Sequence, residues 1–298
     1  MAFAGTRRRT LRRYAEGLKE VFKIIVSDKA GLVGFIIIII YILMGTIGPM
    51  VVPYPAAGNP NEVYLPPSWE HPLGTDFEGK DVFAQIVHGT PVVLTVAFLT
   101  GFLTTLIGVF LGALAGFKGG IADTIIMGTA DFILTIPQFP LFAVLSALVK
   151  FKDVSMLSVL LASVSWPTLA RAIRSQILSM REREFIEAAR LLGFSTFDII
   201  FTEMIPNIMP YIAVSFMFNS IYAIYAQVGL AYLGLVPFIG ENWGLMLNRA
   251  WVLGAFFYEG SIWYIISPII AIVGLQIGFL LFARVLEVIF NPRLRVGG

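Results

Sequence analysis

The chain has 298 residues, of which 57% are hydrophobic and only 13% are charged, and its mean hydropathy is +0.83. A soluble domain carries about 25% charged residues, so this composition excludes an ordinary soluble domain and predicts a surface that mostly faces lipid. The sequence contains no cysteine, which excludes disulfides, iron–sulfur clusters and thiol chemistry.

Segment 1–30 is strongly basic and is followed by an apolar run at 31–52. The run is too long for the hydrophobic part of a signal peptide, and no small-residue cleavage site follows it. We therefore expect a retained first transmembrane helix at 31–52 with a cytoplasmic segment before it. Leu11, Tyr14 and Leu18 recur at helical spacing, so the basic segment could be an amphipathic helix on the membrane face or a solvated tail.

Six apolar runs are long enough to cross a bilayer, since each span needs roughly 20 apolar residues. They lie at 31–52, 91–117, 121–149, 155–175, 209–235 and 261–285. Pro137 and Pro140 fall inside the third run and predict a kink there. The expected fold class is an all-α polytopic membrane protein with six transmembrane helices.

The basic residues are distributed unevenly between the two sides of this arrangement. With the N-terminus inside, 17 of the 21 lysines and arginines fall in segments on the cytoplasmic side. The other four are Lys80, Lys150, Lys152 and Arg249. Cytoplasmic loops carry an excess of positive charge. The asymmetry therefore favours six spans in the cytoplasmic membrane, with both termini, including a tail at 286–298, in the cytoplasm.

The outer segment at 53–90 is rich in proline and lacks the apolar content for a domain of its own. We expect extended structure and one short helix near 79–87 lying on the bundle. In the core at 91–285, Gly108, Gly112 and Gly116 recur every four residues on one helix face. Such a face predicts close packing against another helix.

Nothing in the sequence indicates covalent chemistry. It has no phosphate-binding loop of the form G-x-x-x-x-G-K-[S/T], and its only histidines are His71 and His88. A zinc site needs three or four ligands. We expect a non-catalytic chain with no catalytic residue, no metal site and no nucleic-acid partner.

The polar loop at 176–208 is expected on the cytoplasmic side. Good helix formers from Glu184 onward are followed by Gly193, a suitable C-terminal stop. Ser195 with Asp198 predicts the capped start of a second helix, and Pro206 is expected to end that helix or to kink the entry to the next span. The residues alone favour a partner-docking loop and an ordered loop without a partner about equally.

Glu187-Ala188-Ala189, with Gly193 and Pro206 at their spacing, resembles the EAA loop of membrane subunits of ABC importers. Further segments resemble the dipeptide and oligopeptide permease group. They are Pro53-Tyr54-Pro55, Pro66-Pro67, His71-Pro72-Leu73-Gly74-Thr75-Asp76 with Gly79 and Asp81-Val82, Gly119-Gly120 with Asp123, Asp131 and Pro137, Trp166-Pro167 with Arg171, Tyr232-Leu233-Gly234-Leu235, Trp243-Gly244, and Asn291-Pro292-Arg293. The resemblance covers almost the whole length and implies the permease fold of type I ABC importers, the MetI-like fold.

The resemblance also implies a role for the loop, as coupling helices that fit a groove on a cytoplasmic ATPase. The implied coupling residues are Glu187, Ala188, Ala189, Arg190, Gly193 and Pro206. The implied partners are a second, related permease subunit, two nucleotide-binding ATPase subunits and an extracytoplasmic substrate-binding protein, besides membrane lipid. ATP and Mg²⁺ would be bound by the partner subunits, and no cofactor is expected on this chain.

Polar residues within apolar runs are expected to face a bundle interior or a cavity. Asp131, Asn219 and Gln227 are the candidate pathway or gate residues, and Asp131 is expected to pair with an arginine near the inner face. The resembling group often has an acidic residue where this chain has Gln227. A neutral amide there could bind a hydroxyl-rich ligand or simply pack between helices.

The resemblance implies di- and oligopeptides as the substrate, with short oligosaccharides as the alternative that Gln227 leaves open. A secondary transporter or a channel subunit is a weaker alternative. Intramembrane carboxylates are few in this sequence, and clear inverted repeats are absent from it.

Overall fold

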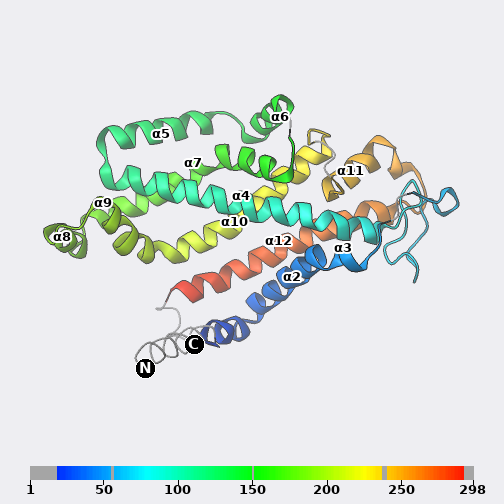
Figure 1. Ribbon diagram of the computed structural model, residues 1–298, viewed down its shortest axis with the longest axis horizontal. Helices are drawn as coiled ribbons and strands as arrows, with labels where there is room; N and C mark the ends of the chain where they lie inside the picture. Colours follow the sequence, from blue (N-terminus) through cyan, green and yellow to red (C-terminus); the bar gives the residue numbers. More distant parts are fainter. Residues whose placement is uncertain (1–18, 55–56, 150, 237–239, 292–298) are drawn as a thin grey trace, which may run out of the picture.

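A computed structural model describes residues 19–54, 57–149, 151–236 and 240–291 of the chain (Figure 1). Most of the expected basic segment, residues 1–18, and the tail from 292 onward lie outside the described residues. The expectations for those parts, including an amphipathic N-terminal helix, therefore stay predictions.

The described chain is built from helices, and five of them are long and apolar enough to cross a membrane. These are α2 (Lys29–Thr46), α4 (Val82–Lys118), α7 (Val154–Arg181), α10 (Met209–Tyr232) and α12 (Ile262–Phe290). The span that contains α10 also includes the helical turns before it, from Thr196 onward. A bent pair, α5 (Gly120–Thr135) and α6 (Gln138–Leu148), makes the sixth. The predicted all-helical, six-span architecture is confirmed to that extent.

The kink predicted in the third span is a complete break. The α5 and α6 axes meet at 91° across Ile136 and Pro137. Pro137 has no backbone N–H to continue a helical hydrogen-bond pattern, and its ring disfavours the helical conformation of the residue before it. Ile136 is accordingly extended, with φ −90° and ψ 127°.

The helix expected near 79–87 is the first part of α4, which begins at Val82 and runs without interruption past Pro91. The boundary expected at 90 between the outer segment and the first span of the core stays a prediction. Asp81 starts the helix by accepting a hydrogen bond from the backbone N–H of Phe83 at 2.7 Å. The outer segment folds back on itself through an isolated bridge between Thr75 and Asp81.

The glycine face of α4 packs against α7, as its spacing predicted. A β-carbon on Gly112 would overlap the carbonyl oxygen of Ala170, and one on Gly116 would lie 2.8 Å from the carbonyl oxygen of Arg174. The missing side chains therefore let the two backbones approach closely. Figure 1 shows α4 and α7 running side by side along the long axis of the molecule.

The other long helices extend this bundle. Helix α10 packs against both α4 and α12, and α2 packs along α12. Figure 1 places the short helices α8 (Glu184–Leu191) and α9 (Thr196–Asp198) at one end of the long axis. Helix α11 (Trp243–Val252), α3 (Gly48–Val51) and the segment before α4 lie toward the opposite end. Loop 176–208 and the outer segment are therefore separated by the full length of the spans.

Candidate functional site: the loop after α7 and the polar residues of the spans

Helix α8 is anchored to the bundle by one apolar side. Ile186 is completely buried and Ala189 almost so. Both belong to a hydrophobic cluster that contains Ile173 and Ile177 near the C-terminal end of α7, and Met204 beyond α9. Burial of these side chains fixes the orientation of α8, so its opposite side must face outward.

Gly193 ends α8 in the left-handed conformation, with φ +81°. The N–H of Gly193 donates to the Arg190 carbonyl at 3.0 Å, and the N–H of Phe194 donates to the Ala189 carbonyl at 3.1 Å. This pair of bonds is the Schellman arrangement that terminates helices at glycine. The predicted helix stop at this glycine is confirmed.

The second helix of the loop begins where the sequence predicted it. Ser195 and Asp198 form a reciprocal capping box at the N-terminus of α9. The chain continues through a π-helical stretch, Ile199–Met204, and a 3-10 turn, Ile205–Ile208, before α10 begins. Pro206 lies in the first turn of that 3-10 segment. Helix α9 already ends at Asp198, so Pro206 does not end it. The helix changes from π to 3-10 next to the proline, and whether the entry to α10 is kinked there stays a prediction.

The outward side of the loop is both charged and apolar. Glu187, Ala188 and Arg190 are exposed, whereas Ala189 faces the bundle. Large apolar side chains accompany them, namely Leu191 (85% exposed), Leu192, Phe194 and Phe197. Exposed apolar patches rimmed by polar residues mark interaction surfaces. The sequence analysis did not predict that these four side chains belong to the exposed surface of the loop. The apolar sequence Leu-Leu-Gly-Phe within a polar loop could have indicated it.

Two ion pairs join α5 to α7 near the loop end of the bundle. Both oxygens of Asp123 accept hydrogen bonds from Arg174, each at 2.5 Å. Asp131 accepts from Arg171, whose Nε lies 3.0 Å from Oδ1. The structure thus supplies the arginine partner expected for Asp131. Together with the apolar packing of Ala130 against Trp166 and Ala170, these pairs hold α5 against α7.

Asn219 and Gln227 do not meet Asp131 or each other. The Asn219 amide donates to the hydroxyl of Thr105 on α4 at 3.0 Å. Gln227 is fully buried, and within the described part of the chain neither its amide nitrogen nor its amide oxygen has a hydrogen-bond partner. Their role in a pathway stays a prediction, and this structure encloses Gln227 inside the subunit.

A cavity of about 520 Å³ opens between α4, α10 and α12 on the half of the bundle nearest the loop. Its walls include Phe102, Ile212, Phe216 and Phe290. The polar side chain among the lining residues is Thr105, which Asn219 already engages. These walls suit apolar groups such as lipid chains or a neighbouring helix better than a polar solute.

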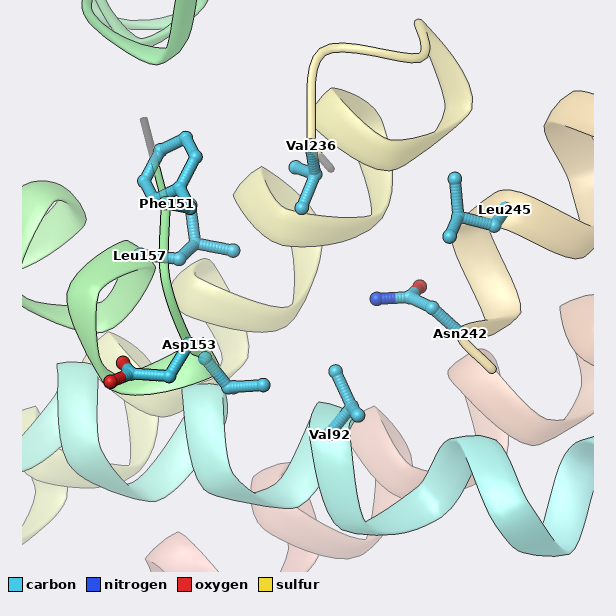
Figure 2. Close-up of a pocket in the computed structure, with 8 residues that line it drawn as sticks. Val92, Phe151, Asp153, Leu157, Val236, Asn242 and Leu245 are labelled. Carbon is cyan, nitrogen blue, oxygen red and sulfur yellow. The ribbon is translucent and has the colours of Figure 1, made fainter. Parts of the chain in front are cut away.

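A second, much smaller crevice lies at the opposite end of the bundle (Figure 2). It has a volume of about 10 Å³ and is lined by Val92, Phe151, Leu157 and Leu245, among others. In Figure 2 the Asn242 side chain points into the crevice, while the carboxylate of Asp153 points away from it. A space of this size barely holds one water molecule, so the crevice does not serve as a solute site.

Comparison with known proteins identifies the family. Residues 108–296 match the model of the binding-protein-dependent transport system inner membrane component. The chain belongs to this family. Residues 18–67 also match the N-terminal TM domain of oligopeptide transport permease C. The two matches together cover most of the core and the first span, so the chain is a transport permease of this family.

Individual relatives agree with this membership. The permease is 33% identical to the oligopeptide transport system permease protein OppC of Bacillus subtilis over 224 residues, 74% of this chain and 73% of that protein. It is 30% identical to the dipeptide transport system permease protein DppC of Alkalihalophilus pseudofirmus over 281 residues, 93% of this chain and 90% of that protein.

A solved structure supports the fold. The permease resembles a chain of the inward-facing MetNI methionine ABC transporter, with a TM-score of 0.53 and 18% identity. The likeness covers 68% of this chain and 96% of that one. The MetI-like permease fold that the sequence resemblance implied is confirmed.

Proposed function

We propose that this permease forms half of the translocation pathway of an ATP-driven importer for di- and oligopeptides. In this proposal an extracytoplasmic binding protein delivers the peptide, and a second, related permease subunit forms the other half of the pathway. Two cytoplasmic ATPase subunits bind ATP and Mg²⁺ and energise the cycle. The peptide assignment rests on the relatives named as oligopeptide and dipeptide permeases, which match most of the chain.

The loop after α7 is the proposed coupling element. The observation that carries this assignment is the outward face of α8 and the Gly193 turn, where Glu187 and Arg190 lie beside exposed Leu191 and Leu192. Charged and apolar groups side by side outside the spans suit docking to a soluble protein. Both termini and this loop are then cytoplasmic, and α11 is extracytoplasmic.

Movement of the loop has a physical route into the spans. Ile186 packs into the same buried cluster as Ile173 of α7 and Ala113 of α4. Coupling through packed side chains requires that the two states of the importer differ in their contacts with ATP-bound and ATP-free partners. A shift of α8 would therefore displace the inner parts of α4 and α7 with it.

The test is ATP hydrolysis by the reconstituted complex of both permeases, both ATPases and the binding protein. The complex is challenged with a set of di- to pentapeptides and, separately, with a set of short oligosaccharides. The proposal expects stimulation by peptides. Stimulation by oligosaccharides alone would replace the substrate but keep the importer, whereas hydrolysis that responds to no solute and no binding protein would contradict the importer itself.

A further inference from the structure

Helix α10 has two chemically different sides. One side contributes Met209, Ile212, Ala213, Phe216 and Met217 to the apolar cavity beside α12. The opposite side carries an exposed aromatic residue every seven residues. These are Tyr211, Phe218, Tyr225 and Tyr232. Seven residues are close to two helical turns, so the four rings form one stripe along the helix.

The depth and exposure of Tyr225 indicate which environment this stripe faces. Tyr225 lies seven residues, about 10 Å, from the end of α10 next to α11, so its ring belongs to the hydrocarbon depth of a membrane rather than its rim. It is 62% exposed, and its hydroxyl bonds to no other group among the residues that the structure describes. A hydroxyl directed at lipid without a partner is unfavourable. Tyr211 and Tyr232, near the helix ends, would suit a membrane interface equally well.

The break between α5 and α6 lies beside this stripe. The Tyr222 hydroxyl, three residues before Tyr225, donates to Oε1 of Gln138 at 2.6 Å, and Gln138 Nε2 donates to the Val164 carbonyl at 3.4 Å. Val164 is ten residues, about 15 Å, into α7, so the break is near mid-membrane. Phe139 lies against Gly229 on the same side of α10.

Irregular backbone at this depth is tolerated where protein buries it or where it lines a water-filled cavity. Thr135 and Pro137, on either side of Ile136, are exposed in the subunit. Two independent features, an exposed helix break and an unpartnered tyrosine, are both accounted for by a polar environment at the same place. Gln227 lies two residues from Tyr225 and so on the opposite side of α10.

We infer that the wall made by Tyr225, Phe218, Tyr222 and Gln138 is the mid-membrane surface that the transported solute touches. This inference rests on the proposed importer function. Neither α10 nor α6 carries a charged residue. The wall therefore contacts its solute through hydroxyl, amide and aromatic groups, and it recognises the neutral backbone amides common to all peptides rather than charged side chains. Hydroxyl groups of an oligosaccharide share this chemistry, and the experiment separates the two.

The natural absence of cysteine makes the wall directly testable by thiol labelling. Tyr225→Cys is introduced into the full reconstituted complex in proteoliposomes and treated with a membrane-impermeant methanethiosulfonate. Adduct formation on this chain is followed by mass spectrometry. Ile270→Cys is the control, because Ile270 is 61% exposed and lies eight residues into α12, a similar depth on a face without polar groups. Phe218→Cys provides a second wall position if the first variant fails to assemble.

The inference expects the wall cysteine to react at least about tenfold faster than the Ile270 control, since the reagent needs a thiolate in water. Peptide plus binding protein should slow that reaction, and Tyr225→Phe should lower uptake of peptides with acidic, basic and neutral side chains alike. Reaction as slow as the control, or fast reaction that no solute slows, would overturn the inference. Protection by oligosaccharides alone would overturn the peptide part. These results are separable from failure of the importer proposal, which would appear as solute-independent ATP hydrolysis.

Discussion

The guanidinium of Arg190 lies over the ring of Phe117, 5.1 Å from its centroid. Arg190 belongs to α8, and Phe117 is the second-last residue of α4. The loop after α7 is therefore tied to the C-terminal end of α4 by a cation–π contact as well as by apolar packing. In the proposed importer, this contact would pass movement of α8 to the span that packs most extensively in the bundle.

A double-mutant cycle on this contact tests that connection. Arg190→Ala and Phe117→Leu should each lower peptide uptake per ATP hydrolysed, and the double variant should be little worse than either single one. The reason is that two residues sharing one contact are not additive, with coupling of about 0.5–1 kcal/mol expected for an exposed cation–π pair. Uptake-to-hydrolysis ratios in proteoliposomes provide the measurement. Fully additive losses would mean that the two residues act separately.

Substitutions of Gly193 can distinguish the effect of backbone strain at this position from an effect on docking of the ATPase. A β-carbon there would meet no atom within 4 Å, so a side chain is sterically free within the subunit. Asn and Asp adopt the left-handed conformation more readily than other residues, whereas Ala costs roughly 1–2 kcal/mol there. We predict that Gly193→Asp leaves the subunit folded but couples poorly, with uptake reduced about tenfold, equivalent to about 1.4 kcal/mol.

Gly193→Asn is the matched neutral control for that experiment. It should fall between the wild type and Gly193→Asp, because it adds the same bulk to the docking surface without charge. Glu187→Lys, on the same exposed side, should also lower ATPase stimulation. Normal transport by Gly193→Asp would remove the turn from the docking surface, and unchanged stimulation in Glu187→Lys would remove Glu187.

Close packing of α4 on α7 predicts a strong effect of Gly112→Ala. The added methyl would overlap the Ala170 carbonyl, a backbone atom that cannot rotate away. We expect a loss of about 1–3 kcal/mol in stability, the usual range for overpacking. The same substitution at Gly128 meets no atom within 4 Å and should be neutral or stabilising by up to about 1 kcal/mol. Thermal unfolding in detergent compares the two, and equal effects would contradict the packing.

Asp76 predicts a pH dependence of the outer segment. Burial raises the pKa of this carboxyl above its usual value of 3.8, against hydrogen bonds from the backbone N–H groups of Lys80 and Glu78 and from the Gln85 amide, which lower the pKa. A raised folded-state pKa means that protonation favours the folded segment. Its stability should therefore be greatest below pH 3.8 and should fall as pH rises through the raised pKa, then level off.

Asp76→Asn is the control for this pH effect. The asparagine keeps an acceptor for the two backbone N–H groups, and its amide can donate to Oε1 of Gln85, which lacks a partner in the described chain. Hydrogen exchange across residues 57–81 between pH 4 and 7 should show a slope in the wild type that the variant lacks. A slope of the opposite sign, or an identical slope in Asp76→Asn, would contradict the assignment to Asp76.

Local signals in the sequence predicted local structure well. Gly193 after a run of helix formers predicted the end of α8, and Ser195 three residues before Asp198 predicted the capping box. Pro137 predicted a kink in the third span. In each case the responsible residues are neighbours in the chain, so their backbone preferences act without help from the rest of the fold.

Features that depend on tertiary contacts were not predictable in this way. The start of α4 at Val82 depends on the outer segment folding back to Asp81, whereas the apolar run in the sequence begins only at residue 91. The hydrogen bond between Tyr222 and Gln138 joins residues 84 positions apart. Which side of α10 is exposed also depends on how α4 and α12 pack, so Gln227 was an expected pathway residue while Tyr225 was not.

The most direct test of the account is ATP-dependent uptake of a labelled di- or tripeptide into proteoliposomes containing the complete complex. Binding protein and peptide are supplied outside, and ATP and Mg²⁺ are trapped inside with the ATPase subunits. The proposed importer should show uptake that needs both ATP and the binding protein and that falls about tenfold with Gly193→Asp, equivalent to about 1.4 kcal/mol. Peptide uptake that proceeds equally well without ATP, or driven by an ion gradient alone, would contradict it.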